Sequence, residues 1–167
     1  DDILATTLSR HLSIWFGEPF VVTARGNGQV WCEHRLFSAY ITRNASAAVR
    51  RFLANQIRHT AIWHRRVPQY VIGTAAATRV GVLFASSAGI FVSPEVPRAS
   101  DRIIMPGNRR IRFFDLAEGR SRVVLKDGFS SDAIEAELAI RAADGAGPFP
   151  PILAHNCAAG WFTEPIF

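Results

Sequence analysis

The sequence predicts an α+β protein, with an antiparallel sheet and one packed helix preceded by a mixed α/β extension. Three observations support this fold class. Residues 102–127 contain short runs of apolar and β-branched residues separated by turn-forming residues, which is typical of antiparallel strands. Residues 132–143 follow with apolar side chains at helical spacing. Residues 1–98 alternate between helix-like and strand-like patterns, so we expect one domain over 1–98 and a second over 99–167.

The expected sheet begins with a strand-like run at 102–105. A turn at 106–108 leads into a second run at 109–115, and a further turn at 116–120 leads into a third run at 121–126. The turns are rich in Gly, Pro and Asn, which favour reversal of the chain. Together these segments predict a three-stranded antiparallel meander.

The helix expected at 132–143 has a start signal, because either Ser130 or Ser131 can act as its N-cap. Acidic residues in its first turn are favourable at the positive end of the helix dipole. Helical spacing places Glu137 beside apolar neighbours, so we expect its side chain to point toward the sheet.

Lys126, at the end of the third expected strand, is unusual in this chain. It is the only lysine among nineteen Lys and Arg residues. A compact ammonium group suits a phosphate ligand, whereas a broad guanidinium suits other tasks, so this choice of residue suggests a chemical role. A single lysine in an arginine-rich chain is also compatible with chance.

In this order of elements, the segment 102–167 resembles the small nucleotide-binding lobe of protein-kinase-like phosphotransferases, and most closely the aminoglycoside and choline phosphotransferase group. The resemblance lies in the Pro-Gly-Asn turn at 106–108, the V-V-L-K run that ends in Lys126, and the A-E-L-A-I-R run that contains Glu137. The prolines at 148–151 resemble the approach to the fourth strand of that lobe. The apolar C-terminal run resembles its fifth strand and hinge.

The resemblance implies an ATP-binding site in this segment. A loop at Gly107 and Asn108 would cover the phosphates, and Lys126 would neutralise them. Glu137 would hold Lys126 in place, with Glu135 the less favoured choice. Backbone groups of the hinge, at Glu164 and Ile166, would receive the adenine ring.

The chain contains no H-x-D-x-x-x-x-N motif. The resemblance therefore places the catalytic base and the ligands of magnesium (Mg²⁺) beyond Phe167, with no catalytic residue and no metal ligand in this chain. The expected function is the N-terminal part of an ATP-dependent phosphotransferase acting on a small-molecule hydroxyl group. The ligands would be the nucleotide and that acceptor, and both ends of the chain look like cuts in a longer polypeptide.

Residues 1–98 are expected to contain a helix at 2–15, then a hairpin around the Gly-rich turn 24–28 and a second helix at about 46–65. Strand-like runs follow at 70–73, 80–84 and 89–92. The stretch from Tyr70 to Val92 is long enough to span a bilayer, but a central arginine and many small polar residues favour strands over a membrane helix.

The formal net charge of +5 raises an alternative function. The chain would then be a non-catalytic α+β binding or interaction module whose basic helix contacts nucleic acid or a partner protein. Its arginines would bind phosphates and Trp63 would stack on bases, although a solvated helix face explains the same pattern and disfavours nucleic acid as a partner. The residues concerned are Arg50, Arg51, Arg58, Arg65 and Arg66.

The two cysteines, Cys32 and Cys157, are far apart and predict neither a disulfide framework nor a zinc site. The five histidines show no metal-ligand spacing. A reducing, cytoplasmic location is expected from this cysteine usage, and the absence of a membrane partner is expected from the apolar pattern.

Overall fold

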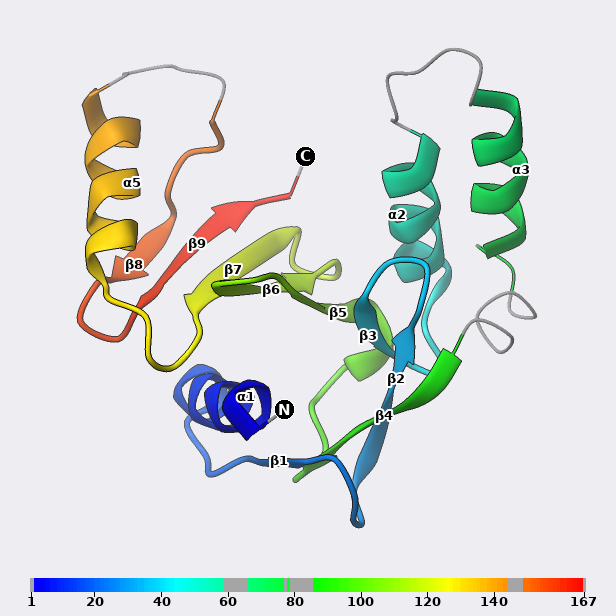
Figure 1. The fold of residues 1–167 in the computed structure, drawn as a ribbon, viewed down its shortest axis with the longest axis horizontal. Coiled ribbons are helices and arrows are strands. Elements are labelled where there is room, and N and C mark those ends of the chain that lie inside the picture. The colour runs from blue at the N-terminus through cyan, green and yellow to red at the C-terminus, as the bar shows by residue number, and fades with distance from the viewer. Residues whose placement is uncertain (1, 59–65, 77, 79–85, 144–148, 167) are drawn as a thin grey trace. The chain divides into compact units, whose positions relative to one another are not determined.

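The computed structural model of the chain describes residues 2–58, 66–76, 78, 86–143 and 149–166 (Figure 1). It is an α+β fold in which every strand pairing described below is antiparallel. This confirms the α+β class and the antiparallel sheet expected from the sequence.

Contacts divide the chain into two compact units. One combines residues 1–22 with 104–167 and is called the terminal unit here; the other spans 23–103 and is called the central unit. The sequence led us to expect a division into 1–98 and 99–167. The observed division differs chiefly because the first 22 residues belong with the C-terminal segment.

The described part of the terminal unit contains two helices and most of the strands of the chain's second half. Its strands follow the order β5-β6-β7-β9-β8 within the sheet, so β9 lies between β7 and β8. The unit boundary falls within β5, and the short strand β1 (Val21–Thr23) spans the other boundary. The elements are α1 (Asp2–Phe16), β5 (Arg102–Pro106), β6 (Arg110–Asp115), β7 (Arg120–Leu125), α5 (Asp132–Ala143), β8 (Ala154–Asn156) and β9 (Trp161–Pro165).

The register of the sheet fixes which residues lie at each end of the strands. Arg110 on β6 is opposite Leu125 on β7, at the end of the sheet that carries the turn at Gly107. Arg120 on β7 is opposite Pro165 on β9, at the other end. The meander expected over 102–127 is therefore present, with each strand within one or two residues of its expected bounds.

Helix α5 covers one face of this sheet. Ile134 is fully buried against Val123, Leu125 and Phe162, and Leu138 packs on the same cluster. The helix begins where the sequence indicated, because the Ser130 hydroxyl accepts a hydrogen bond from the backbone N–H of its first residue (3.2 Å).

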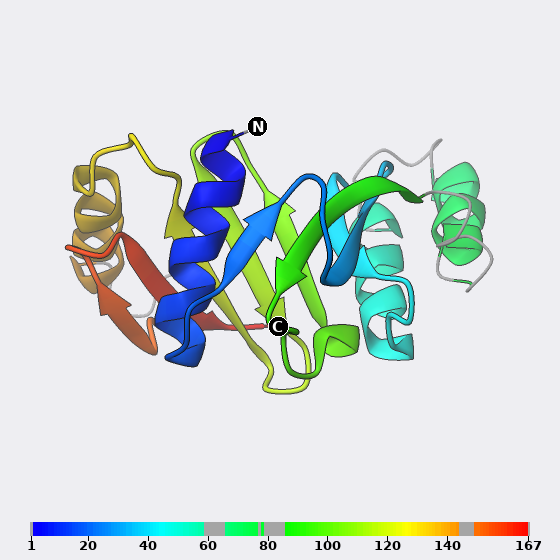
Figure 2. The ribbon, with the colours of Figure 1, turned by 90° about the horizontal axis from the view of Figure 1, so that it is seen from below.

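Helix α1 covers the opposite face. Trp15 packs edge-on against Phe113, with ring centroids 5.6 Å apart, and the guanidinium of Arg122 lies over the Trp15 ring. Arg122 and Val123 are consecutive on β7, so their side chains point to opposite faces of the sheet. Figures 1 and 2 show α1 running alongside β7 and β9 on the side away from α5.

The central unit has strand order β4-β2-β3. Helices α2 and α3 pack against each other (Figure 1). At Gly89 on β4 the backbone of β2 comes so close that an added Cβ would lie 1.7 Å from the carbonyl oxygen of Trp31. The elements are β2 (Gln29–His34), β3 (Ala39–Thr42), α2 (Ala47–Arg58), α3 (Arg66–Ala76), β4 (Ser86–Ser93) and the 3-10 turn η2 (Ala99–Asp101).

Two expectations for this unit are wrong. The run 70–73 lies in the helix α3 rather than in a strand, because its Val and Ile residues form a short apolar run that fits either structure. No hairpin forms around 24–28, because β2 has β3 and β4 as its neighbours. The strand at 89–92 is present as part of β4, whereas 80–84 lies outside the described residues.

Candidate functional site

Cationic residues gather at the end of the β6–β7 pair that carries the Gly107 turn. The backbone N–H of Lys126 donates to the carbonyl oxygen of Arg109 (3.0 Å), so these two residues lie across from each other just beyond the paired strands. Arg110 begins β6, and its carbonyl oxygen accepts a hydrogen bond from the Gly107 N–H (2.7 Å). Gly107 and Asn108 are exposed at the tip of the turn.

Two cavities lie at this end of the sheet and share Leu125 and Phe129. Each has a volume of about 270 Å³. The Arg110 cavity is lined by Arg109, Arg110, Leu125, Phe129, Ser130, Asp132 and Ala133. The Lys126 cavity is lined by Arg10, Leu125, Lys126, Asp127, Gly128, Phe129, Ser131, Ala158, Ala159 and Gly160.

The ion pair expected between Lys126 and Glu137 is not formed, and that expectation is wrong. Glu137 instead forms ion pairs with Arg110 on β6 and with Arg141 one helical turn further along α5. The reason is the alternation of side chains on β7. Leu125 packs against α5, and the next residue, Lys126, is therefore directed toward the other face.

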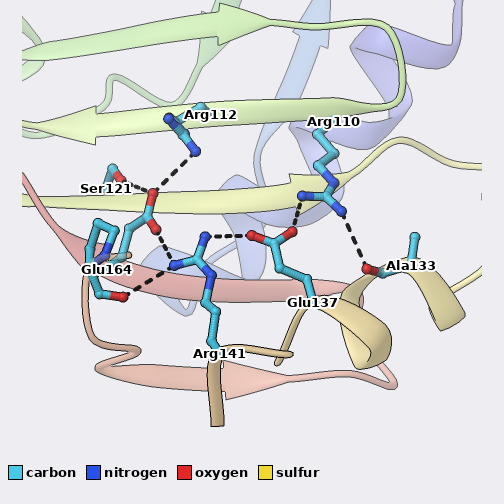
Figure 3. Close-up of polar contacts among 8 residues, drawn as sticks. Arg110, Arg112, Ser121, Ala133, Glu137, Arg141 and Glu164 are labelled. Carbon is cyan, nitrogen blue, oxygen red and sulfur yellow. Dashed lines mark hydrogen bonds and ion pairs between the residues drawn. The ribbon is translucent and has the colours of Figure 1, made fainter. Parts of the chain in front are cut away.

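Glu137 does point toward the sheet, as expected from helical spacing, and it belongs to a larger network of charges (Figure 3). Arg141 reaches from α5 to Glu164 on β9, with 2.8 Å between Nη1 and Oε2. Arg112 on β6 approaches the other oxygen of Glu164 at 3.2 Å, and Ser121 on β7 donates to that oxygen at 3.4 Å.

This network is anchored in the protein interior. The side chain of Glu164 is 5% exposed and that of Arg141 is 10% exposed. Arg141 also donates to the carbonyl oxygen of Pro150 (3.2 Å) and lies over the rings of Phe149 and Phe162. Burial acts to lower the pKa of Arg141, but its hydrogen bonds to Glu164 and Glu137 raise that pKa overall.

The structure separates the remaining expected site residues into two groups. Gly107, Asn108 and Lys126 lie at one end of the β6–β7 pair. Ile166 lies at the other end, where its N–H donates to the carbonyl oxygen of Gly119 (2.8 Å). The six residues of β7 separate these ends by roughly 17 Å, at about 3.3 Å per residue.

The buried carboxylate of Glu164 forms ion pairs with Arg112 and Arg141, so it belongs to the charge network. The sequence did contain a signal for this network that our expectations missed. Arg110 and Arg112 are two apart on a strand, and Glu137 and Arg141 are four apart on a helix, so each pair shares one face.

At the Gly107 end, the exposed Arg109 and the half-buried Arg110 and Lys126 lie near a turn whose backbone is accessible, and cations of this kind can bind phosphate oxygens such as those of ATP. Magnesium has no counterpart here: among the described residues, no three or more His, Cys, Asp or Glu side chains are grouped as a metal site would require. Helices in the described part of the chain lack the combination of length and apolar character needed to cross a membrane.

The basic helix of the alternative function was expected over about 46–65, and its described part is α2 (Ala47–Arg58), because 59–65 lie outside the described residues. Arg66 is the first residue of α3. Arg51 is exposed, whereas Arg50 donates to the carbonyl oxygen of Ala45 beside the start of α2. Trp63 and Arg65, together with His59 and His64, lie outside the described residues.

With this geometry in place, the fold and site define an α+β protein with a cationic strand end next to a glycine turn. No known protein family matches the chain, and no significant match was found among curated proteins or solved structures.

Proposed function

We propose that the terminal unit is the small, nucleotide-binding lobe of an ATP-dependent phosphotransferase that acts on a small-molecule hydroxyl group. The chain order of its parts supports this: a strand, a glycine turn, two strands, a helix and two further strands. This is the order expected from the resemblance to kinase-like phosphotransferases.

The observation that carries the proposal is the ion pair between Arg110 and Glu137. In kinase-like lobes, a carboxylate on this helix orients a cation toward the nucleotide phosphates. Here the oriented cation is Arg110, which begins the strand directly after the Gly107 turn. Its Nη2 also donates to the carbonyl oxygen of Ala133 (3.3 Å), so α5 holds the guanidinium in two places.

The phosphate groups of one nucleotide would meet Arg110 in the Arg110 cavity and Lys126, just beyond β7, in the adjoining Lys126 cavity. Both are cations that stabilise the negative charge of phosphate oxygens, and a guanidinium can donate two parallel hydrogen bonds to them. Bound ATP would supply the phosphoryl group, with Mg²⁺ neutralising its charge. The adenine ring would extend toward Ile166 at the opposite end of β7.

A direct test is a calorimetric titration of the full chain with ATP and Mg²⁺. We expect Arg110→Gln to weaken ATP binding about ten-fold or more, the effect of losing one charge-assisted hydrogen bond. Glu137→Gln should weaken it less, and Lys126→Ala should weaken it measurably. Arg25→Gln, in an exposed turn of the central unit, is the matched control and should bind as the wild type does.

The second candidate is a non-catalytic α+β binding or interaction module. Two observations favour it: Glu137 does not hold Lys126, and Lys126 is directed away from α5. The same titration separates the two functions. A wild-type chain that does not bind ATP, or that binds it as tightly as both Arg110→Gln and Lys126→Ala, would favour the module.

A further inference from the structure

The Lys126 cavity includes a residue from outside the kinase-like segment. Arg10 on α1 lines it together with the loop that follows β7 and the turn that precedes β9. Helix α1 is held against this loop by a hydrogen bond from the Asp127 N–H to the Thr7 hydroxyl (2.9 Å). The cavity is therefore built from segments that are more than 100 residues apart in sequence.

The guanidinium of Arg10 is held in a defined position. Its Nη2 lies 2.6 Å from the Asp127 carboxylate and 3.1 Å from Nε2 of His11. His11 is fully buried, and its burial, reinforced by the charge of Arg10, lowers its pKa to about 4. The imidazole is therefore neutral near pH 7, and its Nε2 can accept the hydrogen bond from Arg10. Nevertheless, the Arg10 side chain remains 47% exposed.

The cavity carries an excess of positive charge. Arg10 and Lys126 contribute two positive charges and Asp127 contributes one negative charge, which leaves a net charge of about +1. In the part of the chain that the structure describes, Lys126 forms no ion pair with a carboxylate. The hydroxyl-bearing residue Ser131 also lines the cavity and can donate to an anion.

We propose that Arg10 and Lys126 together bind a phosphate group of an oligophosphate in this cavity, so that helix α1 forms part of the ligand site. This inference deepens the proposed function and rests on it for the identity of the ligand as a nucleotide. At about 270 Å³ the cavity is slightly smaller than sites for drug-sized ligands, and its lining of charged and hydroxyl-bearing side chains suits a small polar group.

The test uses inorganic tripolyphosphate as the probe and the full chain at low ionic strength, because salt screens exposed charges. We expect the wild type to bind, and Arg10→Gln and Lys126→Gln each to weaken binding about ten-fold. Arg10→Lys should retain part of the affinity. Arg25→Gln removes one positive charge, as the other two glutamine variants do, but it lies outside the cavity, so it should bind as the wild type does.

Asp127→Asn separates a binding role from a structural one. If Arg10 and Lys126 contact the phosphate, removing the neighbouring negative charge should tighten tripolyphosphate binding by about three-fold, as expected for one partly exposed charge. If Arg10 acts only through its ion pair with Asp127, the same variant should weaken binding as Arg10→Gln does. The proposal would be overturned by that result, by a wild type that does not bind, or by normal binding in either glutamine variant.

The two proposals can fail separately. In one outcome, tripolyphosphate binding depends on Arg10 and Lys126, ATP binds no more tightly than tripolyphosphate, and Arg110→Gln leaves ATP affinity unchanged. That outcome would support the phosphate site in the cavity and contradict the nucleotide-binding function. Loss of ATP affinity in Arg110→Gln, together with unchanged ATP and tripolyphosphate binding in Arg10→Gln, would retain the function and remove α1 from the site.

Discussion

Arg141 on α5 and Glu164 on β9 form an ion pair of 2.8 Å in which both side chains are nearly inaccessible to solvent. Because Arg141 also pairs with Glu137, the position of Glu137 is coupled to the sheet through a buried contact. The same carboxylate holds Arg110 next to the Gly107 turn. The buried ion pair between α5 and β9 is thus linked, through Glu137, to Arg110 at the candidate phosphate site.

The first prediction concerns this buried pair. Glu164→Gln leaves Arg141 and Arg112 without their shared carboxylate, so we expect the free energy of unfolding to fall by about 3 kcal/mol. The matched control is Glu118→Gln, which breaks an exposed ion pair with Arg120 and should cost less than about 1 kcal/mol. Urea unfolding of both variants provides the measurement. Equal losses would contradict a special role for the buried pair.

A second prediction contrasts Arg141 with Arg122, which lies between the rings of Trp15 (4.9 Å) and Trp161 (4.4 Å). Among the described residues, the buried Nε and Nη1 of Arg122 have no hydrogen-bond acceptor, and burial, together with the charge of Arg120, lowers its pKa to about 10. Arg122→Met loses the cation–π contacts, about 0.5–2 kcal/mol, but removes donors whose burial costs about as much.

We therefore expect Arg122→Met to change the free energy of unfolding by less than about 1 kcal/mol. Arg141→Met removes one ion-pair partner from Glu137 and the buried partner from Glu164, and it should cost about 3 kcal/mol. Denaturant unfolding, followed by far-UV circular dichroism, compares the two variants. A loss of several kcal/mol in Arg122→Met would mean that the stacked guanidinium contributes more than this balance allows.

The third prediction is a pH dependence that arises from His11. In the folded chain its pKa is lowered from 6.5 to about 4, chiefly by burial. Between these values the unfolded chain binds a proton that the folded chain does not, so stability falls as the pH decreases from about 6.5 toward 4. The contribution is at most about 3 kcal/mol, at 1.36 kcal/mol per pKa unit.

Measuring the free energy of unfolding at several pH values between 7 and 4 tests this prediction. His11→Leu should show a smaller loss of stability across this range than the wild type, whereas His155→Gln, at an exposed position, should keep the wild-type slope. Parallel slopes for the wild type and His11→Leu would show that His11 does not carry this dependence.

A fourth prediction concerns Gly89, where an added Cβ would meet the backbone of Trp31 at 1.7 Å. The pairing of β2 with β4 changes register at this point, and backbone atoms cannot move aside as a flexible side chain can. We expect Gly89→Ala to destabilise the central unit by about 3 kcal/mol or more.

The control for Gly89→Ala is Gly17→Ala. Gly17 has φ of +73° but open space around it, so alanine there should cost about 1 kcal/mol from backbone strain alone. Thermal unfolding of both variants distinguishes steric overlap from strain. Similar losses in the two variants would argue against the close approach of β2 and β4.

The sequence could predict the parts of the terminal unit whose signals are local. Helix α5 occupies the expected 132–143, because a serine cap and helical apolar spacing both mark it. Strands β6 and β7 lie within a residue of their expected bounds, since turn residues separate them clearly. The run 70–73 is not bounded by such turn or capping residues, and the helix α3 was therefore missed.

The site was harder to predict because it depends on which face each strand presents. The proposed pairing of Lys126 with Glu137 matched chain order, but it overlooked that Leu125 already occupies the face toward α5. The contribution of Arg10 had no signal in its own neighbourhood. It arises from contacts between α1 and residues more than 100 positions later, which chain order alone does not indicate.

The membership of α1 in the terminal unit has a consequence for biosynthesis. The helix, whose Leu8 and Leu12 are buried in the folded chain, is synthesised before the 23–103 segment, whereas the 104–167 segment of the same unit is synthesised after it. At about 5–20 residues per second, this interval of roughly 80 residues corresponds to about 4–16 s. During that time the apolar side of the nascent helix lacks its native cover, which makes it a natural substrate for chaperones that bind emerging chains.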